Sequence, residues 1–340
     1  MKKKILVTGA AGFIGFHLTK FLLKKNFKVI GVDNINNYYS KKLKLNRLKI
    51  LLNFKNFFFY KKDITNQKDL EKIFIKNKPQ VVINLAAMAG VRFSIKQPKK
   101  YIKNNINSFQ NILELSNKYK VKHLVYASSS SIYGMNSKIP FSEEDRASHP
   151  ISVYAATKRS NELLAHVYSN MYKLPTTGLR FFTVYGPWGR PDMALFKFVK
   201  SALKNKKIDL YNFGNHIRDF TYIDDVVKII YLSINKIPKL DKNKSITEFQ
   251  SKAPWRIYNI SSSRPVKLKK FIGQIEKQLN TKINFKNLPL QVGDVKIATG
   301  SMRRTISKFG YKPKYQTNYG IKKFVSWYKE YYKLTWLLLR

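Results

Sequence analysis

The chain has 340 residues, of which 44% are hydrophobic and 14% aromatic, so it is too apolar for a disordered protein and long enough to bury a large core. It contains no cysteine, which excludes a disulfide framework, a thiolate zinc site, an iron–sulfur cluster and a cysteine nucleophile. Its five histidines show no metal-ligand spacing, so we expect no metal site.

The net charge of +46 raises the question of a polyanionic partner such as RNA or an anionic membrane surface. Only 12 of the 65 cationic residues are arginine, and the lysines are spread along the whole chain. We interpret them as a solvated surface and expect no specific nucleic-acid partner. No apolar run is long enough for a membrane span or a signal peptide, which predicts a cytoplasmic protein without integral membrane association.

Strands and helices alternate over the first 180 residues. Apolar runs predict six strands and a first helix, and three-to-four-residue periodicity predicts further helices between the strands. The expected strands are Lys4–Thr8, Phe27–Val32, Phe57–Lys61, Gln80–Leu85, Lys122–Ser128 and Thr176–Phe182, and the clearest helices are Phe13–Lys24, Tyr101–Tyr119 and Tyr154–Tyr172. This order predicts an α/β fold, a Rossmann-type doubly wound parallel sheet with helices on both faces.

After Phe182 the pattern becomes irregular, with one more helix at Ile223–Asn235 and one strand at Arg256–Ile260. We expect the larger domain to span residues 1–182, with returns near 220–236 and 255–262. A smaller mixed α/β substrate domain is expected over 183–219 and 263–340. The polar segment 239–253 is expected to be a loop.

A glycine trio follows the first strand and opens the first helix. Gly9 permits a tight turn, Gly12 lets backbone amides approach a pyrophosphate, and Gly15 allows close packing of helix and strand. Asp33 lies 18 residues beyond Gly15. A carboxylate at this position accepts hydrogen bonds from the adenosine ribose hydroxyls and repels a 2′-phosphate. The pattern therefore predicts NAD rather than NADP. Asp63-Ile64 is a candidate for the adenine pocket.

Tyr154 and Lys158 lie four residues apart on one face of a predicted helix. A neighbouring ammonium favours the phenolate and is expected to lower the tyrosine pKa, so that the pair acts as a base on a sugar hydroxyl. Upstream, Ser129 follows the fifth strand within a run of four serines, where hydroxyls point into the ligand crevice.

These motifs make the chain resemble the extended short-chain dehydrogenase/reductases, and within them the UDP-glucuronate 4-epimerases. The resemblance rests on TGAAGFIG from Thr8, Asp33-Asn34, NLAA from Asn84, AGVR from Ala89, SSSSIYG from Ser128 and YAATK from Tyr154. It also rests on TTGLRFFTVYGPWGRPDMA from Thr176, RDFTYIDD from Arg218 and GDV from Gly293.

The resemblance implies roles for individual residues. Tyr154 is the base, Lys158 its partner and holder of the nicotinamide ribose, and Ser129 the partner of the reacting hydroxyl. Further cofactor-binding positions are Phe13, Ile14, Ala86 and Ala87. The substrate-binding set is Ser129, Ser130, Ser131, Met193, Phe196, Tyr211, Arg218 at the UDP diphosphate, and Asp294.

The implied reaction is a reversible oxidation at C4 of a UDP-sugar. Related dehydratases place Asp-Glu where this chain has Ser130 and Ser131, which disfavours dehydration. Arg190 and Thr183 are candidates for holding the carboxylate of a uronic acid. The alternatives that stay open are a UDP-galactose/UDP-glucose 4-epimerase, a UDP-glucuronate decarboxylase, and a basic RNA- or membrane-surface-binding protein on an enzyme scaffold.

Two further expectations concern assembly. The helices Tyr101–Tyr119 and Tyr154–Tyr172 carry apolar residues on more than one face (Ile102, Ile106, Phe109, Leu113, Leu163, Leu164, Val167, Met171), and the resemblance implies that they pair into a homodimer. The apolar tail Leu334–Arg340 is expected to pack on the smaller domain, the alternative being contact with a membrane surface.

Overall fold

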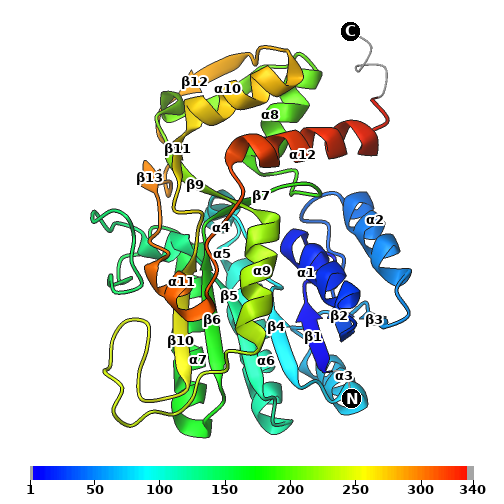
Figure 1. Ribbon diagram of the computed structural model, residues 1–340, viewed down its shortest axis with the longest axis vertical. Coiled ribbons are helices and arrows are strands. Elements are labelled where there is room, and N and C mark those ends of the chain that lie inside the picture. Colours follow the sequence, from blue (N-terminus) through cyan, green and yellow to red (C-terminus); the bar gives the residue numbers. More distant parts are fainter. Residues whose placement is uncertain (1–2, 335–340) are drawn as a thin grey trace.

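The computed structural model describes residues 3–334 and is built on a seven-stranded sheet (Figure 1). All neighbouring strands in it are parallel, in the order β10-β6-β5-β4-β1-β2-β3. The strands are β1 (Lys4–Thr8), β2 (Lys28–Val32), β3 (Phe57–Tyr60), β4 (Val81–Asn84), β5 (His123–Ser129), β6 (Thr176–Phe181) and β10 (Trp255–Ile260). This confirms the predicted Rossmann-type α/β fold.

The strand order changes direction at β1, which pairs with β2 on one side and with β4 on the other. At the carboxyl end of β1, Thr8 lies opposite Val32 on β2 and Asn84 on β4. The segments that follow these three strands therefore meet at one edge of the sheet. Ligands of open parallel sheets bind at such a reversal point.

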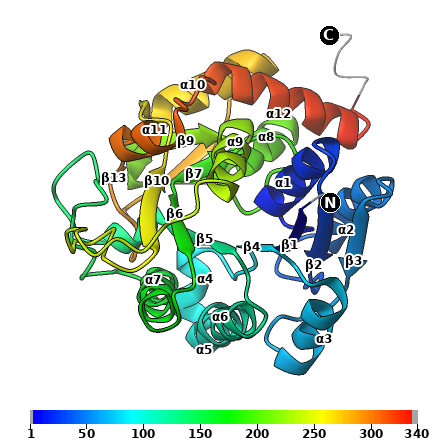
Figure 2. The same ribbon diagram turned by 60° about the horizontal axis from the view of Figure 1, so that its bottom comes forward.

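Helices cover both faces of this sheet (Figure 2). One face carries α1 (Phe13–Lys24), α2 (Lys41–Leu52), α9 (Ile223–Ile234) and α11 (Arg303–Phe309). The other carries α3 (Gln67–Asn77), α6 (Ser108–Lys118) and α7 (Val153–Tyr172). Side chains of β1 alternate between the two cores, because Ile5 and Val7 pack with α1 whereas Leu6 packs with α6.

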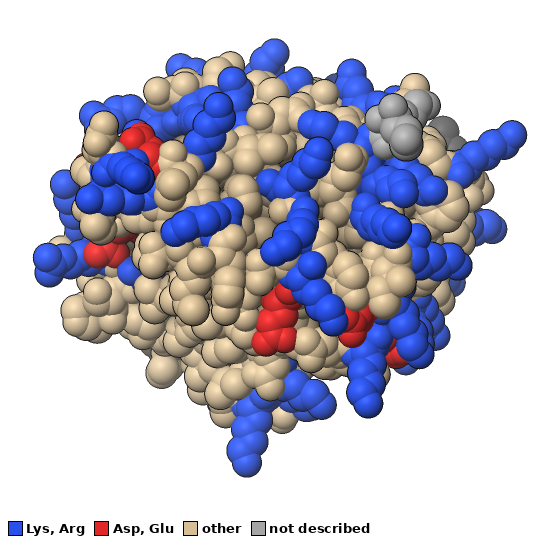
Figure 3. All heavy atoms as spheres, turned by 90° about the horizontal axis from the view of Figure 1, so that it is seen from below, with Lys and Arg blue, Asp and Glu red and all other residues tan. Residues whose placement is uncertain are grey.

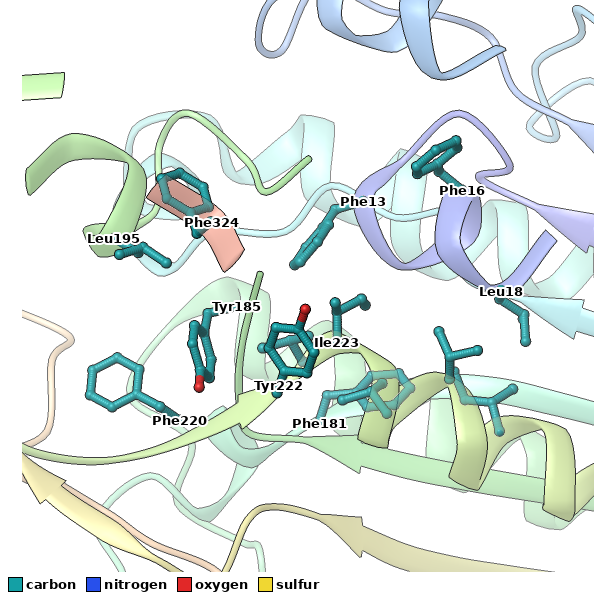
Figure 4. Close-up of a cluster of buried hydrophobic side chains, with 14 of the residues drawn as sticks. Phe13, Phe16, Leu18, Phe181, Tyr185, Leu195, Phe220, Tyr222, Ile223 and Phe324 are labelled. Carbon is teal, nitrogen blue, oxygen red and sulfur yellow. The ribbon is translucent and has the colours of Figure 1, made fainter. Parts of the chain in front are cut away.

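A smaller layer lies beyond the carboxyl edge of the sheet, at the top of Figure 1. It contains β7 (Thr183–Tyr185), β9 (Ile217–Tyr222), β11 (Pro265–Lys267) and β13 (Ile297–Ala298) in one sheet, and the pair β8 (Ile208–Tyr211) and β12 (Phe285–Leu288). Its helices are α8 (Ala194–Leu203), α10 (Leu268–Leu279) and α12 (Thr317–Tyr331). Figure 4 shows that Phe13 and Phe16 of α1 share one buried cluster with Tyr185, Phe220 and Phe324 of this layer.

The segment expected as one helix over Tyr101–Tyr119 consists of three pieces. After α4 (Val91–Lys96), α5 (Pro98–Tyr101) continues into a π-helical turn, Ile102–Asn107, and then into α6. Within residues 3–334, two 3₁₀ turns, Ser130–Tyr133 and Asn212–Gly214, complete the regular structure.

None of the helices within residues 3–334 combines the length and apolarity needed to cross a membrane. Of the predicted tail Leu334–Arg340, Leu334 packs against the hydrophobic core, and residues 335–340 lie outside the described residues.

Candidate active site

Three glycines shape the turn between β1 and α1. Gly9 has a φ of +68°, which favours glycine, and a Cβ there would lie 2.9 Å from the amide nitrogen of Ala86. A Cβ at Gly15 would collide with the carbonyl oxygen of Gly9. Gly12 caps α1 without a side chain. The turn is therefore a bare backbone cradle at the positive end of a helix, and it fits a pyrophosphate.

Phe13 and Ile14 begin α1, directly after this cradle. The side chain of Phe13 is buried in the core, and Ile14 packs against the same cluster. The first backbone N–H groups of a helix have no partner within it. The amides of these two residues, rather than their side chains, are thus the groups that a ligand at the helix start would meet.

Asp33 follows β2 and lies beside the glycine turn. One carboxylate oxygen accepts a hydrogen bond from the amide of Ala11 at 3.1 Å, and the other accepts from the amide of Ile35 at 2.8 Å. A carboxylate oxygen has two acceptor positions, so each oxygen retains capacity for a ribose hydroxyl. Asp33 both fixes the turn and presents a negative charge where a 2′-phosphate would lie.

Asp63 follows β3 and is tied to Asn34, which follows β2. Its carboxylate accepts from Asn34 Nδ2 at 2.8 Å and from the amide of Thr65 at 2.9 Å. Burial raises the pKa of Asp63, but the hydrogen bonds from Thr65 and Asn34 outweigh burial and leave the pKa below its usual value. Ile64 is buried beside it. A role of this pair at an adenine ring stays a prediction.

Ala86 and Ala87 follow β4 and form the third side of the crevice. The amide of Ala86 donates to the hydroxyl of Thr8 at 3.1 Å, and that hydroxyl donates to Asn84 Oδ1 at 2.6 Å. These bonds join the ends of β1 and β4, so the alanines lie against the glycine turn.

Asn105, in the π-helical turn, holds the segment that continues from these alanines. It accepts from the amide of Met88 at 2.8 Å and donates to the carbonyl of Met88 at 3.0 Å. It also donates to the hydroxyl of Thr157 at 3.0 Å, next to Lys158. A π-helical turn of this kind is frequent at functional sites. The turn positions the loop after β4 against α7.

Tyr154 and Lys158 lie one turn apart at the start of α7, which Ser152 caps by accepting from the amide of Ala155 at 3.1 Å. Lys158 Nζ donates to the carbonyl oxygen of Ala127 on β5 at 2.9 Å. Burial lowers the pKa of Lys158 to about 8. The ammonium is thereby held at the carboxyl edge of the sheet, beside Ser129.

The pKa of Tyr154 differs from the sequence-based expectation. Burial raises it, while a hydrogen bond with Ser129 and the charge of Arg190 act in the opposite direction. Lys158 was expected to lower this pKa, but its ammonium is engaged by a carbonyl group, and in this structure the effect of burial is the larger. The structure does bring Tyr154, Ser129 and Lys158 together as predicted.

The serine run ends β5 and turns into the 3₁₀ segment that contains Ser130 and Ser131. The hydroxyl of Ser129 accepts from the amide of Ser131 at 3.2 Å. The preceding Ser128 faces the other way and donates to the buried carboxylate of Glu162 at 2.7 Å, which also pairs with Arg180. This network fixes the carboxyl end of β5 and therefore the position of Ser129.

Thr183, Arg190 and Met193 line one pocket between the two layers. Arg190 is engaged within the protein: its Nε donates to Asp192 at 3.0 Å, and its Nη2 donates to the carbonyl of Ala89 at 2.6 Å. These bonds hold the guanidinium over the loop after β4. Nη1 donates to no acceptor among the described residues, so it can donate to a ligand.

A second charged cluster surrounds Asp294. Arg218 Nη2 lies 2.8 Å from one of its oxygens, and His216 Nε2 and Arg92 Nη2 lie 3.6 and 4.0 Å from the other. The guanidinium of Arg92 also lies 4.4 Å from the ring centroid of Tyr211. The structure thus unites the predicted residues Arg218, Asp294 and Tyr211 in one electropositive group that fits a diphosphate.

Among the predicted substrate-binding residues, Phe196 has the least exposed side chain. Its side chain is 3% exposed and packs edge-on against Phe324 and Tyr328, with ring centroids 5.8 and 5.3 Å apart. Its main role in this structure is in the core, although it borders the pocket of Thr183 and Arg190.

Sequence reasoning missed three polar residues of the site. Arg92 lies in the AGVR segment that carried part of the resemblance, so a signal for it was present. His216 and Asn105 gave no such signal, because their roles depend on contacts with Asp294 and Met88 that are distant in the chain.

Comparison with known proteins gives one family and many relatives. The model of the "NAD dependent epimerase/dehydratase family" matches residues 5–247. The protein CapI of Staphylococcus aureus is 50% identical over 333 residues, which cover 97% of this chain and 99% of the relative. A probable UDP-glucuronate 4-epimerase of Rhizobium meliloti is 42% identical over 335 residues, 97% of this chain and 98% of the relative.

Solved structures of 4-epimerases are also similar to this chain. A UDP-glucuronic acid 4-epimerase from Bacillus cereus in complex with UDP-glucuronic acid and NAD superposes with a TM-score of 0.86 at 33% identity, covering 97% of this chain and all of the other. A UDP-glucose 4-epimerase from Thermotoga maritima with UDP-glucose superposes with a TM-score of 0.82 at 29% identity, covering 97% and 99%.

Proposed function

The chain belongs to the NAD dependent epimerase/dehydratase family, and we propose that it interconverts UDP-glucuronate and UDP-galacturonate by NAD-dependent inversion at C4. The observation that carries this proposal is the meeting of Tyr154, Lys158 and Ser129 at the edge of the sheet, behind a glycine cradle. One relative is a probable UDP-glucuronate 4-epimerase, and a similar solved UDP-glucuronic acid 4-epimerase is in complex with UDP-glucuronic acid and NAD. The choice of the uronic acid rests on Arg190 and Thr183.

The residues around the cradle fit NAD. Gly9, Gly12 and Gly15 leave room for its pyrophosphate, and Asp33 would accept its adenosine ribose hydroxyls. Bound NAD supplies reversible oxidation at C4 of the sugar, which permits inversion without net redox change. Lys158 would hold the nicotinamide ribose.

Tyr154 is the base that takes the proton of the 4-hydroxyl. Since burial raises its pKa, the phenolate needs nearby positive charge and hydrogen-bond donors, and Ser129 and Arg190 already act in this direction. Ser129 would also orient the reacting oxygen. Lys158, with a pKa of about 8, is mostly charged at neutral pH and adds positive charge to the crevice.

The substrate would lie across both layers. Arg218, supported by Asp294 and Arg92, would bind the diphosphate, with Tyr211 and Met193 near the nucleoside. Thr183 and the free Nη1 of Arg190 would hold the sugar carboxylate. Holding it keeps the C5–carboxyl bond out of line with the carbonyl of the 4-keto sugar, which suppresses loss of CO₂. Hydroxyls at Ser130 and Ser131 offer no carboxyl acid–base pair for dehydration.

The remaining expectations form part of the same proposal. Residues 1–182, with 220–236 and 255–262, would act as the cofactor domain, and 183–219 with 263–340 as the substrate domain. The enzyme would be a homodimer that works in the cytoplasm and supplies an activated uronic acid for polysaccharide assembly.

One experiment distinguishes the candidate reactions. The purified protein is incubated with UDP-glucuronate and, separately, with UDP-glucose, and the products are identified by chromatography and NMR. We expect UDP-galacturonate from the first. UDP-xylose with release of CO₂ would identify a decarboxylase, and conversion of UDP-glucose alone would identify a UDP-galactose/UDP-glucose 4-epimerase.

A further inference from the structure

Arg47 on α2 joins two loops that belong to different parts of the site. Its side chain is completely buried. Nη1 donates to the carbonyl of Ala11 in the glycine turn at 2.9 Å, and Nη2 donates to the carbonyls of Trp188 and Gly189 at 2.5 and 3.4 Å. One guanidinium therefore holds the cofactor loop and the loop that carries Arg190.

The charge of Arg47 has no carboxylate partner. Among the salt bridges of residues 3–334 none includes Arg47, and its buried Nε has no hydrogen-bond partner. Asp33 reaches the same turn but accepts from the amide of Ala11 instead. An unpaired buried cation is costly unless an anion lies near it. The glycine turn that Arg47 contacts is where an anionic pyrophosphate fits.

A second side chain holds the same loop. His17 on α1 contacts the carbonyl of Pro187 through Nε2 at 2.9 Å, and burial lowers the pKa of His17 to about 3. The imidazole is thus neutral near pH 7, and it donates Nε2–H to this carbonyl. Three consecutive carbonyls, those of Pro187, Trp188 and Gly189, accept from side chains that flank the glycine turn.

The conformation of Trp188 shows how firmly the loop is held. Its φ is +59°, a left-handed conformation that is rare for a bulky residue. Its ring packs against Phe16 of α1 and Trp327 of α12, with centroids 5.5 and 5.3 Å apart. Arg190 follows two residues later and reaches Ala89. The geometry at Arg190 therefore depends on a loop anchored at the cofactor turn.

We propose that Arg47 is a positioning residue that provides a counter-charge for the cofactor pyrophosphate. Its planar guanidinium, which donates from two nitrogens to two loops, would also set the loop that presents Arg190 to the substrate. The second half rests on the proposed function, because it assigns the carboxylate to Arg190. Loss of Arg47 should then weaken the binding of both NAD and UDP-glucuronate, whereas binding of UDP alone should not change.

Two substitutions separate the charge of Arg47 from the hydrogen-bonding geometry of its guanidinium. Arg47→Met removes both, and Arg47→Lys keeps only the charge. Lys49→Met, at an exposed position of the same helix, is the matched control. NAD retained after gel filtration and its Kd are measured first. The Kd values of UDP-glucuronate and of UDP are then measured by calorimetry at saturating NAD, and circular dichroism reports folding.

We expect Arg47→Met to weaken NAD and UDP-glucuronate binding by about tenfold each, with UDP within about twofold of the control. Arg47→Lys should restore NAD binding but not UDP-glucuronate binding. Unchanged affinities in Arg47→Met, equal losses for UDP and UDP-glucuronate, or full recovery of both affinities in Arg47→Lys would each overturn the proposal.

If Arg47→Met does not fold, Arg47→Lys decides alone: weaker binding of UDP-glucuronate with UDP unchanged supports the proposal, and unchanged UDP-glucuronate affinity overturns it. Failure of the wild-type protein to epimerise UDP-glucuronate would count against the proposed function. The dependence of NAD retention on Arg47 is measured without turnover, so the two failures are distinguishable.

Discussion

At the scale of single residues, the phenol of Tyr154 is the proposed base. Tyr154→Phe removes the acidic oxygen and keeps the ring, so we expect turnover to fall by at least ~10²-fold with little change in substrate affinity. Steady-state kinetics and calorimetry measure the two effects. Tyr172→Phe, at an exposed position of the same helix, should leave both unchanged. Full activity of Tyr154→Phe would refute the assignment of the base.

Lys158 makes stability depend on pH in a defined window. Its folded-state pKa of about 8 lies below the unfolded value of 10.5, so the unfolded chain binds the proton more tightly. Burying the charged ammonium lowers the free energy of unfolding, and this penalty is complete below pH 8 and disappears as the pH rises toward 10.5. Lys158→Met removes this penalty. Its free energy of unfolding relative to wild type should therefore decrease by about 1–3 kcal/mol between pH 7 and 10.5.

Urea denaturation at several pH values measures this difference. Because the other titrating groups are common to both proteins, they cancel in the comparison. A difference that is independent of pH would contradict the lowered pKa of Lys158.

Asp33 is expected to select the cofactor. Asp33→Ala removes acceptors for the ribose hydroxyls and the bond to the amide of Ala11, so NAD binding should weaken by about 1–3 kcal/mol. Titration calorimetry with NAD and NADP measures both affinities. Wild-type protein that prefers NADP would contradict the assignment, and Asp69→Ala, at a solvent-accessible ion pair of α3, serves as the control.

At the scale of elements, the sequence predicted the sheet better than the connections. Each predicted strand of the first 180 residues agrees with the structure to within one residue at either end, because runs such as Ile5–Val7 are buried on both faces and read as continuous apolar segments. The glycine turn and the Tyr154–Lys158 pair are local in sequence and could be found there. The cluster at Asp294 could not, since it depends on long-range contacts.

The π-helical turn at Ile102–Asn107 shows the limit of periodicity. Its apolar spacing fits an ordinary helix, and the hydrogen bonds of Asn105 with Met88 and Thr157 in the π-helical turn are long-range contacts that the periodicity does not reveal. The sequence also predicted outer apolar residues on both helices. The structure buries Phe109 and Leu113 and leaves Ile102 exposed.

Asn105 gives an element-scale prediction. Asn105→Ala leaves the amide and carbonyl of Met88 without their side-chain partner in a buried place, so we expect a loss of about 1–3 kcal/mol in the free energy of unfolding. Chemical denaturation measures it. Asn104→Ala, at the partly exposed neighbour whose side chain bonds to the carbonyl of Lys100 in the same helical segment, should cost less. Equal stability of the two variants would show that the hydrogen bonds of Asn105 to the backbone of Met88 do not contribute to the free energy of unfolding.

At the scale of the whole molecule, the positive charge is distributed over the surface. Figure 3 shows lysine and arginine side chains spread over one face, with few acidic residues between them. Among the buried charges, Arg180 is paired with Glu162, whereas Arg47 is held by carbonyl groups without a carboxylate partner among the described residues. This arrangement agrees with a solvated basic surface, on which attraction to polyanions would be general and would weaken with salt.

The outer face of α7 remains apolar and leads to the prediction of a homodimer. Leu163, Val167 and Met171 are 54, 44 and 61% exposed and lie four residues apart, while Ala165 and Ser169 on the other face are buried. Figure 2 shows α7 beside α6, away from the smaller layer. An exposed apolar stripe on one helix is a common surface for pairing of two copies. We therefore expect a dimer built from these helices.

Light scattering at micromolar concentrations should give twice the mass of one chain. Leu163→Glu combined with Val167→Glu places charges in the stripe and should produce monomers, because burying unpaired carboxylates opposes association. Leu52→Glu substitutes a leucine on α2 that is 57% exposed outside the stripe, and it should leave the dimer intact. Monomeric wild-type protein over this range would contradict the dimer, and a double variant that stays dimeric would place the interface elsewhere.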